Sequence, residues 1–186
     1  SLSVMMILNE DAQSFTSTVH GLADDLFQRS KVPMTKQEVR SVSMSKLQPK
    51  ATDLIYDIGA GTGSCSIELA LLASQGKVWA FERNPVAVEL LGKNKALFGV
   101  DNLEVIAGEA LENIKAAPDC VFVGGSGGDL CEMLDVIYAK NSNCRVVINA
   151  ITVETLAEVA AYYKEHPAYS LEIVNVFVAR SKHLGS

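Results

Sequence analysis

The chain of 186 residues lacks the features that mark several large classes of protein. It contains no apolar run of about 18 residues, which a membrane-spanning helix requires. It has 16 Lys and Arg against 22 Asp and Glu, a net charge of −6. Proteins that bind nucleic acids generally need a positive surface that neutralises phosphates. We therefore expect neither a membrane nor a nucleic acid among its partners.

Metal and redox motifs are also missing. No two cysteines form a C-x-x-C pair, and the three histidines are far apart in the sequence. Apolar residues surround each cysteine, as is typical of reduced cysteines in a protein core. These cysteines are Cys65, Cys120, Cys131 and Cys144. The pattern predicts no metal site and a cytoplasmic location.

Hydrophobic residues make up 48% of the chain, enough to form a substantial core in a single domain. From residue 53 onward, short apolar runs alternate with helical patterns. The expected strands are 53–58, 77–81, 103–107, 120–123, 145–150 and 171–179, and the expected helices are 64–73, 85–98, 110–116, 129–139 and 153–166. This alternation predicts an α/β fold, a doubly wound Rossmann-like sandwich around a mostly parallel sheet.

The first part of the chain does not follow this alternation. We interpret residues 1–30 as a linker or the tail of an upstream domain, with a short strand at 4–8, and residues 31–186 as the catalytic domain. Residues 36–47 form an amphipathic pattern that predicts a helix with Val39, Val42 and Leu47 inward. Thr35 is its expected N-cap, with Glu38 completing a capping box.

A glycine-rich loop, Asp57-Ile58-Gly59-Ala60-Gly61-Thr62-Gly63, follows the first expected strand. The dinucleotide fingerprint would place its third glycine at position 64, which is Ser64. The Asp57 carboxylate would repel a pyrophosphate and attract an ammonium or sulfonium. S-adenosylmethionine carries both of these cations and no phosphate, so the loop favours this cofactor. A dinucleotide site and a purely structural turn are the alternatives.

Two further acids follow expected strands. Glu82 ends the second strand, where a carboxylate can accept hydrogen bonds from both hydroxyls of a ribose. Gly108-Glu109-Ala110 follows the third strand and is placed to face an adenine ring. Glu109 near a helix N-terminus is the structural alternative.

Four glycines surround Ser126 in Gly124-Gly125-Ser126-Gly127-Gly128, after the fourth expected strand. The letters match the G-x-S-x-G elbow of hydrolases, but no histidine follows in a plausible triad order. We interpret the loop as a flexible lining between methyl donor and acceptor, with Ser126 as a substrate contact.

With these segments assembled, the chain resembles the precorrin decarboxylating methyltransferases of cobalamin biosynthesis. The resemblance extends from about residue 20 to residue 183. It is carried by residues 33–40 (PMTKQEVR), 57–63 (DIGAGTG), 82–85 (ERNP), 108–110 (GEA), 123–128 (VGGSGG) and 149–155 (NAITVET).

The resemblance implies methylation of carbon 15 of a precorrin or cobalt-precorrin by S-adenosylmethionine, with decarboxylation of the acetate on carbon 12. It implies that the cofactor contacts Thr35, the backbone of Gly59, Ala60, Gly61, Thr62 and Gly63, then Glu82 and Ala110. It also implies a homo-oligomer such as a tetramer, a possible fusion to an upstream methyltransferase, and one more strand after residues 171–179.

A tetrapyrrole substrate carries several carboxylates, which need cations. Residues 29–40 contain four basic side chains against one Glu, a local charge of +3. Lys36 and Arg40 are four residues apart and are expected on one face of a helix. We expect this segment to cover the cofactor and bind substrate carboxylates, with a solvated basic face as the alternative.

Decarboxylation requires a proton donor, which the sequence does not identify. Glu109, Asn149, Thr152 and Glu154 are candidates by location alone. The alternative functions are a class I methyltransferase for another small acceptor, a nucleotide-binding module without catalysis, and a scaffold.

Overall fold

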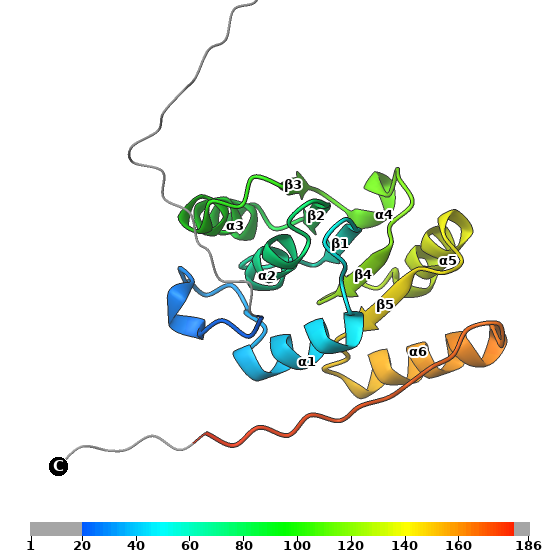
Figure 1. Ribbon diagram of the computed structural model, residues 1–186. Helices are drawn as coiled ribbons and strands as arrows, with labels where there is room; N and C mark the ends of the chain where they lie inside the picture. Colours follow the sequence, from blue (N-terminus) through cyan, green and yellow to red (C-terminus); the bar gives the residue numbers. More distant parts are fainter. Residues whose placement is uncertain (1–19, 181–186) are drawn as a thin grey trace, which may run out of the picture.

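A computed structural model describes residues 20–180 of the chain. Five parallel strands form one sheet in the order β3-β2-β1-β4-β5 (Figure 1). The strands are β1 (Leu54–Ile58), β2 (Lys77–Glu82), β3 (Leu103–Ala107), β4 (Cys120–Val123) and β5 (Arg145–Ile148). The chain moves outward from β1 to β3 and then returns to place β4 on the other side of β1. In open α/β sheets, ligands bind at such a reversal of strand order.

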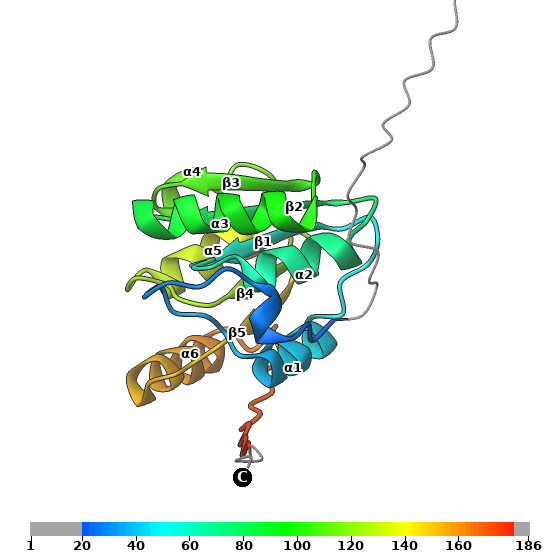
Figure 2. The same ribbon diagram turned by 90° about the vertical axis from the view of Figure 1, so that its left-hand side faces the viewer.

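Helices cover both faces of the sheet (Figures 1 and 2). One core contains side chains from α1, α2 and α3, and the other contains side chains from α4, α5 and α6. The helices are α1 (Gln37–Leu47), α2 (Ser64–Leu72), α3 (Pro85–Phe98), α4 (Ala110–Asn113), α5 (Leu130–Lys140) and α6 (Val153–Glu165). Ile55 and Tyr56 of β1 are both buried, in opposite cores. Burial on both faces explains why the strands read as continuous apolar runs.

The predicted sandwich is confirmed, and five of the six expected strands are present with small shifts at their ends. The predicted cap of α1 is wrong. The helix begins at Gln37, and Lys36 rather than Thr35 is the N-cap. The Asp24 carboxylate accepts the hydrogen bond from the Gln37 backbone N–H, at 3.0 Å. A distant acid therefore does what the capping box was expected to do.

The buried face of α1 is only partly the one predicted: Leu47 faces inward as expected, but Val39 and Val42 do not lead that face. Arg40, Met44 and Leu47 are buried, whereas Val39 and Val42 are only half-buried. The prediction placed apolar residues on the buried face. It could not include Arg40, because a charged residue does not count toward a hydrophobic pattern.

Residues 171–179 form no strand, so this prediction is wrong. After α6 the chain turns back, and these residues run past α1 (Figure 1). Lys46 of α1 pairs with Glu172 at 2.7 Å, and Arg180 pairs with Glu38. A largely apolar run fits a strand, but a strand forms only where a neighbouring backbone supplies its hydrogen bonds. The sheet of residues 20–180 ends at β5.

Residues 20–36 pack against the domain that follows them. Leu22 and Phe27 are buried in the core beside α2 and α3, and a 3-10 turn, η1, spans Asp24–Leu26. The strand expected at residues 4–8 lies outside the described residues. Within residues 20–180, no helix combines the length and the apolar character needed to cross a membrane.

Candidate active site

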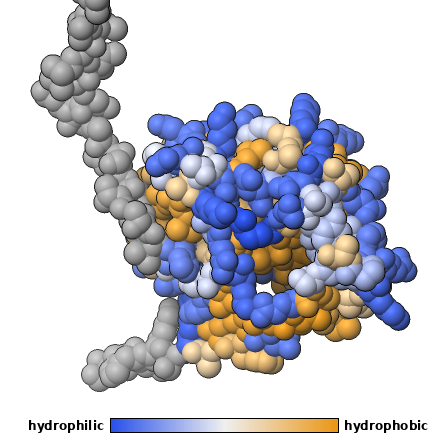
Figure 3. Space-filling model, turned by 45° about the vertical axis from the view of Figure 1, so that its right-hand side comes forward, coloured by the Kyte–Doolittle hydropathy of each residue, from blue (hydrophilic) through white to orange (hydrophobic). Residues whose placement is uncertain are grey.

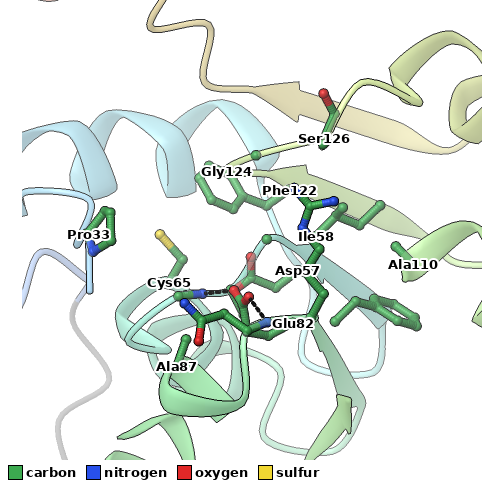
Figure 4. Close-up of a pocket in the computed structure, with 18 of the residues that line it drawn as sticks. Pro33, Asp57, Ile58, Cys65, Glu82, Ala87, Ala110, Phe122, Gly124 and Ser126 are labelled. Carbon is green, nitrogen blue, oxygen red and sulfur yellow. Dashed lines mark hydrogen bonds between the residues drawn. The ribbon is translucent and has the colours of Figure 1, made fainter. Parts of the chain in front are cut away.

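A cavity of about 350 Å³ lies at the carboxyl ends of β1, β2 and β4 (Figure 4). It brings together most of the predicted site: Thr35, Asp57, Gly59, Ala60, Gly61, Glu82, Glu109, Ala110 and Ser126 all line it. Thr62 and Gly63 of the glycine loop do not line it, nor do Lys36, Arg40, Asn149 and Glu154. On the surface, Figure 3 shows a hollow with a largely hydrophilic rim and hydrophobic atoms deeper in.

The glycine loop turns in a way that only glycine tolerates at two positions. Gly59 has a φ of +73°, and a Cβ there would lie 2.5 Å from the carbonyl oxygen of Gly125. Gly63 has a φ of +80°, and its Cβ would lie 2.7 Å from Leu91 Cγ. Both positions are left-handed and tightly packed, so side chains are excluded there. The loop can consequently pass close to the β4 loop and leave the cavity open above it.

Asp57 places an unsatisfied carboxylate oxygen at the cavity. Its side chain is completely buried, and Oδ2 accepts a hydrogen bond from the Ser66 hydroxyl. Oδ1 accepts no hydrogen bond from residues 20–180. Burial raises the pKa of Asp57 to about 7, with Glu82 adding to the shift and the Ser66 hydrogen bond opposing it. A buried polar atom without a partner is costly, so this oxygen suits a ligand that donates a hydrogen bond or carries positive charge.

Glu82 ends β2 and orders the loop opposite. Its Oε2 accepts from the Gly61 backbone N–H at 2.8 Å, and its Oε1 accepts from the Asn84 backbone N–H at 2.8 Å. Each carboxylate oxygen has two lone pairs, so both keep the capacity to accept from a ligand hydroxyl. Glu82 therefore fits a ribose and supports the glycine loop as well.

Glu109 and Arg83 face one another at the cavity wall. The Arg83 guanidinium donates through Nη1 to Glu109 Oε1 at 3.2 Å, and both side chains are about half exposed. Glu109 is the N-cap residue of α4, as the structural alternative expects, but its side chain makes no capping hydrogen bond and lines the cavity. Arg83 is not among the site residues predicted from the sequence. Its position directly after Glu82, at a strand end, was the available signal.

A second cavity of about 300 Å³ adjoins the first. The two share the loop Gly124–Gly127 and Ile151. Asn149 and Thr152 line the second cavity, and Asn149 Oδ1 lies 3.2 Å from the Ser43 hydroxyl that donates to it. Glu154 is exposed and lines neither cavity, whereas Glu158, one helical turn later, lines the second.

The predicted substrate contact of Arg40 is wrong, because its side chain is fully buried. Nε donates to Glu68 at 2.8 Å, Nη1 donates to Asp24 at 2.9 Å, and the guanidinium also donates to the Thr35 and Leu22 carbonyls. Lys36 is exposed outside both cavities. Arg40 thus anchors residues 22–35 to α2, and its buried guanidinium lines neither cavity.

Comparison with known proteins agrees with this geometry. A family model described as a precorrin methyltransferase domain matches residues 25–186. Cobalt-precorrin-6B C(15)-methyltransferase (decarboxylating) of Salmonella typhimurium is 37% identical over 167 residues, 89% of this chain and 87% of that protein. A probable enzyme of the same name from Pyrobaculum aerophilum is also 37% identical, with the same coverage.

Two solved structures are similar over nearly the whole chain. Precorrin-6y C5,15-methyltransferase of Geobacter metallireducens has a TM-score of 0.83 and 36% identity, covering 91% of this chain and 90% of its own. Precorrin 8w decarboxylase of Methanobacterium thermoautotrophicum has a TM-score of 0.81 and 32% identity, covering 88% and 89%. The chain belongs to the precorrin methyltransferase family.

Proposed function

We propose that this protein methylates carbon 15 of a precorrin or cobalt-precorrin with S-adenosylmethionine and removes the carboxyl group of the acetate on carbon 12. The names of its relatives support carbon 15 as the position of methylation and support the accompanying decarboxylation. The structural observation that carries the proposal is the unpartnered Asp57 oxygen at the cavity beside the glycine loop.

The cavity residues fit this cofactor. Asp57 Oδ1 would accept from the cofactor's ammonium, and Glu82 would accept from its ribose hydroxyls. Glu109 and Ala110 line the wall where an adenine would lie, and Thr35 also lines this cavity. When bound, S-adenosylmethionine supplies a methyl group on a sulfonium centre. The protein contributes orientation and exclusion of water, which can lower a barrier by several kcal/mol.

Decarboxylation breaks the bond between the acetate CH₂ and its carboxylate. Carbon dioxide leaves, the electron pair enters the conjugated macrocycle, and a proton added to CH₂ gives a methyl group. The second cavity meets the first at Gly124–Gly127, where we place the reacting edge of the macrocycle with Ser126 as a contact. Of the candidate proton donors, Asn149 and Thr152 line this second cavity and Glu109 lines the first.

Mass spectrometry of the reaction products tests the proposal. The purified protein is incubated with the tetrapyrrole and S-adenosylmethionine, and the product should gain one methyl group and lose one carbon dioxide. A tetrapyrrole that gains a methyl group and keeps all its carboxyl groups would reject the decarboxylation, and an unchanged tetrapyrrole would favour a methyltransferase for another small acceptor. Binding of NAD in place of S-adenosylhomocysteine would reject the methyltransferase assignment.

Glu82→Ala tests the cofactor site separately. Loss of the carboxylate should weaken S-adenosylhomocysteine binding roughly 10- to 100-fold, because hydrogen bonds to charged groups contribute about 1.5–3 kcal/mol. Isothermal calorimetry measures the affinity. Glu89→Ala, which removes an exposed carboxylate paired with Lys93 on α3, is the control and should bind normally. Unchanged affinity in Glu82→Ala would refute the ribose contact.

A further inference from the structure

Among the charged side chains that line the two cavities, acids outnumber bases. In the part of the chain that the structure describes, Asp57, Glu82, Glu109 and Asp129 line the first cavity and Glu158 lines the second. Arg83 is the single Lys or Arg among the lining residues of either cavity. A tetrapyrrole with several carboxylates therefore meets a wall of like charge, with one cation to offset it.

Arg83 is available for a ligand. Its side chain is 58% exposed, and its one hydrogen bond within residues 20–180 is the 3.2 Å contact with Glu109. A guanidinium has five N–H donors, so four remain free of protein partners. Ion pairs between half-exposed side chains contribute little stability, about 0–1 kcal/mol. A substrate carboxylate can therefore share or replace Glu109 at small cost.

The guanidinium also lies where the two cavities meet. A Cβ on Gly127 would come within 3.1 Å of Nη1 and 3.3 Å of Cζ of Arg83. Gly127 belongs to the loop that lines both cavities. Because Gly127 has no side chain, the planar guanidinium can rest against this loop at the wall of the first cavity.

We propose that Arg83 binds a carboxylate of the tetrapyrrole substrate and selects for polycarboxylate acceptors. This inference rests on the proposed function. The planar fork of arginine matches a carboxylate through two parallel hydrogen bonds, which a lysine does not reproduce. Arg83 takes the role predicted for Arg40, whose guanidinium is fully buried and makes four hydrogen bonds inside the protein.

The test compares Arg83→Gln and Arg83→Lys with wild type. Arg83→Gln should raise the KM for the tetrapyrrole about tenfold or more, the loss expected for one charged hydrogen-bonded contact. Arg83→Lys should recover part of the loss, because it keeps the charge without the fork. Lys93→Gln removes an exposed cation of α3 that lines neither cavity and should behave as wild type.

Calorimetry with S-adenosylhomocysteine separates substrate binding from cofactor binding. Its affinity should be the same in Arg83→Gln and wild type. An unchanged tetrapyrrole KM would overturn the inference, and so would an equal loss of S-adenosylhomocysteine affinity, which would assign Arg83 to the cofactor.

Direct titration of the tetrapyrrole, followed by its absorbance, keeps this inference distinct from the proposed function. A wild-type protein that binds the tetrapyrrole without converting it would reject the proposed function. The Arg83 inference would still be decided by whether Arg83→Gln binds more weakly.

Discussion

At the scale of single residues, Asp57 links the ligand site to stability. Its pKa in the folded protein is about 7, above the ordinary value of 3.8, mainly because of burial. Between these two values the folded state holds a proton that the unfolded state has released. Folding stability from this group therefore falls as pH rises from about 4 to about 7.

The variant Asp57→Asn removes this titration. The difference in melting temperature, variant minus wild type, should increase as pH rises from 4 toward 8. Thermal denaturation at a series of pH values measures this difference. The variant should bind S-adenosylhomocysteine more weakly at pH 8, because the charge that attracts its ammonium is gone. A difference in melting temperature that is the same at every pH would contradict the assigned pKa.

Arg40 and Lys36 should differ sharply in their effect on stability. Arg40→Met leaves Glu68 and Asp24 buried without their cation, which typically costs about 3–5 kcal/mol. Lys36→Ala alters an exposed side chain and should change the free energy of unfolding by less than about 0.5 kcal/mol. Urea denaturation monitored by circular dichroism measures both. Similar values for the two variants would show that the buried cluster does not anchor residues 22–35.

At the scale of elements, the glycine loop and α3 offer a matched pair of substitutions. Gly63→Ala should destabilise the protein, because φ is +80° and the new Cβ would meet Leu91 Cγ at 2.7 Å. Gly92→Ala should stabilise it by up to about 1 kcal/mol, because this exposed glycine lies inside α3 with no atom within 4 Å of the new Cβ. Thermal and urea denaturation compare the two. A Gly63→Ala variant as stable as wild type would show that the loop relaxes freely.

The sequence predicted elements well where burial alone determines them. β4 matches its predicted range because a strand buried on both faces requires an unbroken apolar run. β3 also matches, although it is an edge strand with Glu104 exposed. Residues 171–179 have the same local pattern but form no strand. A local sequence pattern does not specify whether a neighbouring strand is present to form backbone hydrogen bonds with the segment.

The same limit applies to the site. The glycine loop and Glu82 were predictable because their position in a βα unit places them at the cavity. Arg40 was misassigned because its partners, Asp24 and Glu68, come from distant segments that a helical pattern does not contain. Arg83 was missed because its importance depends on Glu109 and Gly127, which reach it only in the folded sheet.

At the scale of the whole molecule, opposite charges are separated between the cavity and the segment before it. The net charge is −6, and most of the charged side chains that line the two cavities are acidic. The basic segment 29–40 contributes fewer free cations than its sequence suggests, because Arg40 is buried against two acids. Arg29, Lys31 and Lys36 are exposed. They can attract an anionic substrate over a distance, whereas Arg83 makes the contact.

The described residues also carry an apolar surface that a single copy leaves uncovered. Hydrophobic atoms gather along the lower part of the molecule in Figure 3. Apolar side chains are exposed at the start of α6 and along the segment after it: Ile151, Val153, Leu156, Leu171, Ile173, Val174, Val176, Phe177 and Val178. Large exposed apolar patches usually mark interfaces. β5 is also an edge strand with one side unpaired in residues 20–180, which favours association with another chain.

The resemblance to this family implies a homo-oligomer, and we predict that copies of the chain meet at this surface. Light scattering after size-exclusion chromatography should give a mass that is a multiple of 20.0 kDa. Val176→Asp with Phe177→Asp should lower that mass, because burying two carboxylates at an interface is unfavourable. Val86→Asp, at a valine that is 60% exposed on α3, should leave it unchanged. A wild-type mass of one chain would show that the protein forms no oligomer. An oligomer that the double variant does not weaken would place the interface elsewhere, since the introduced charges would then face only water.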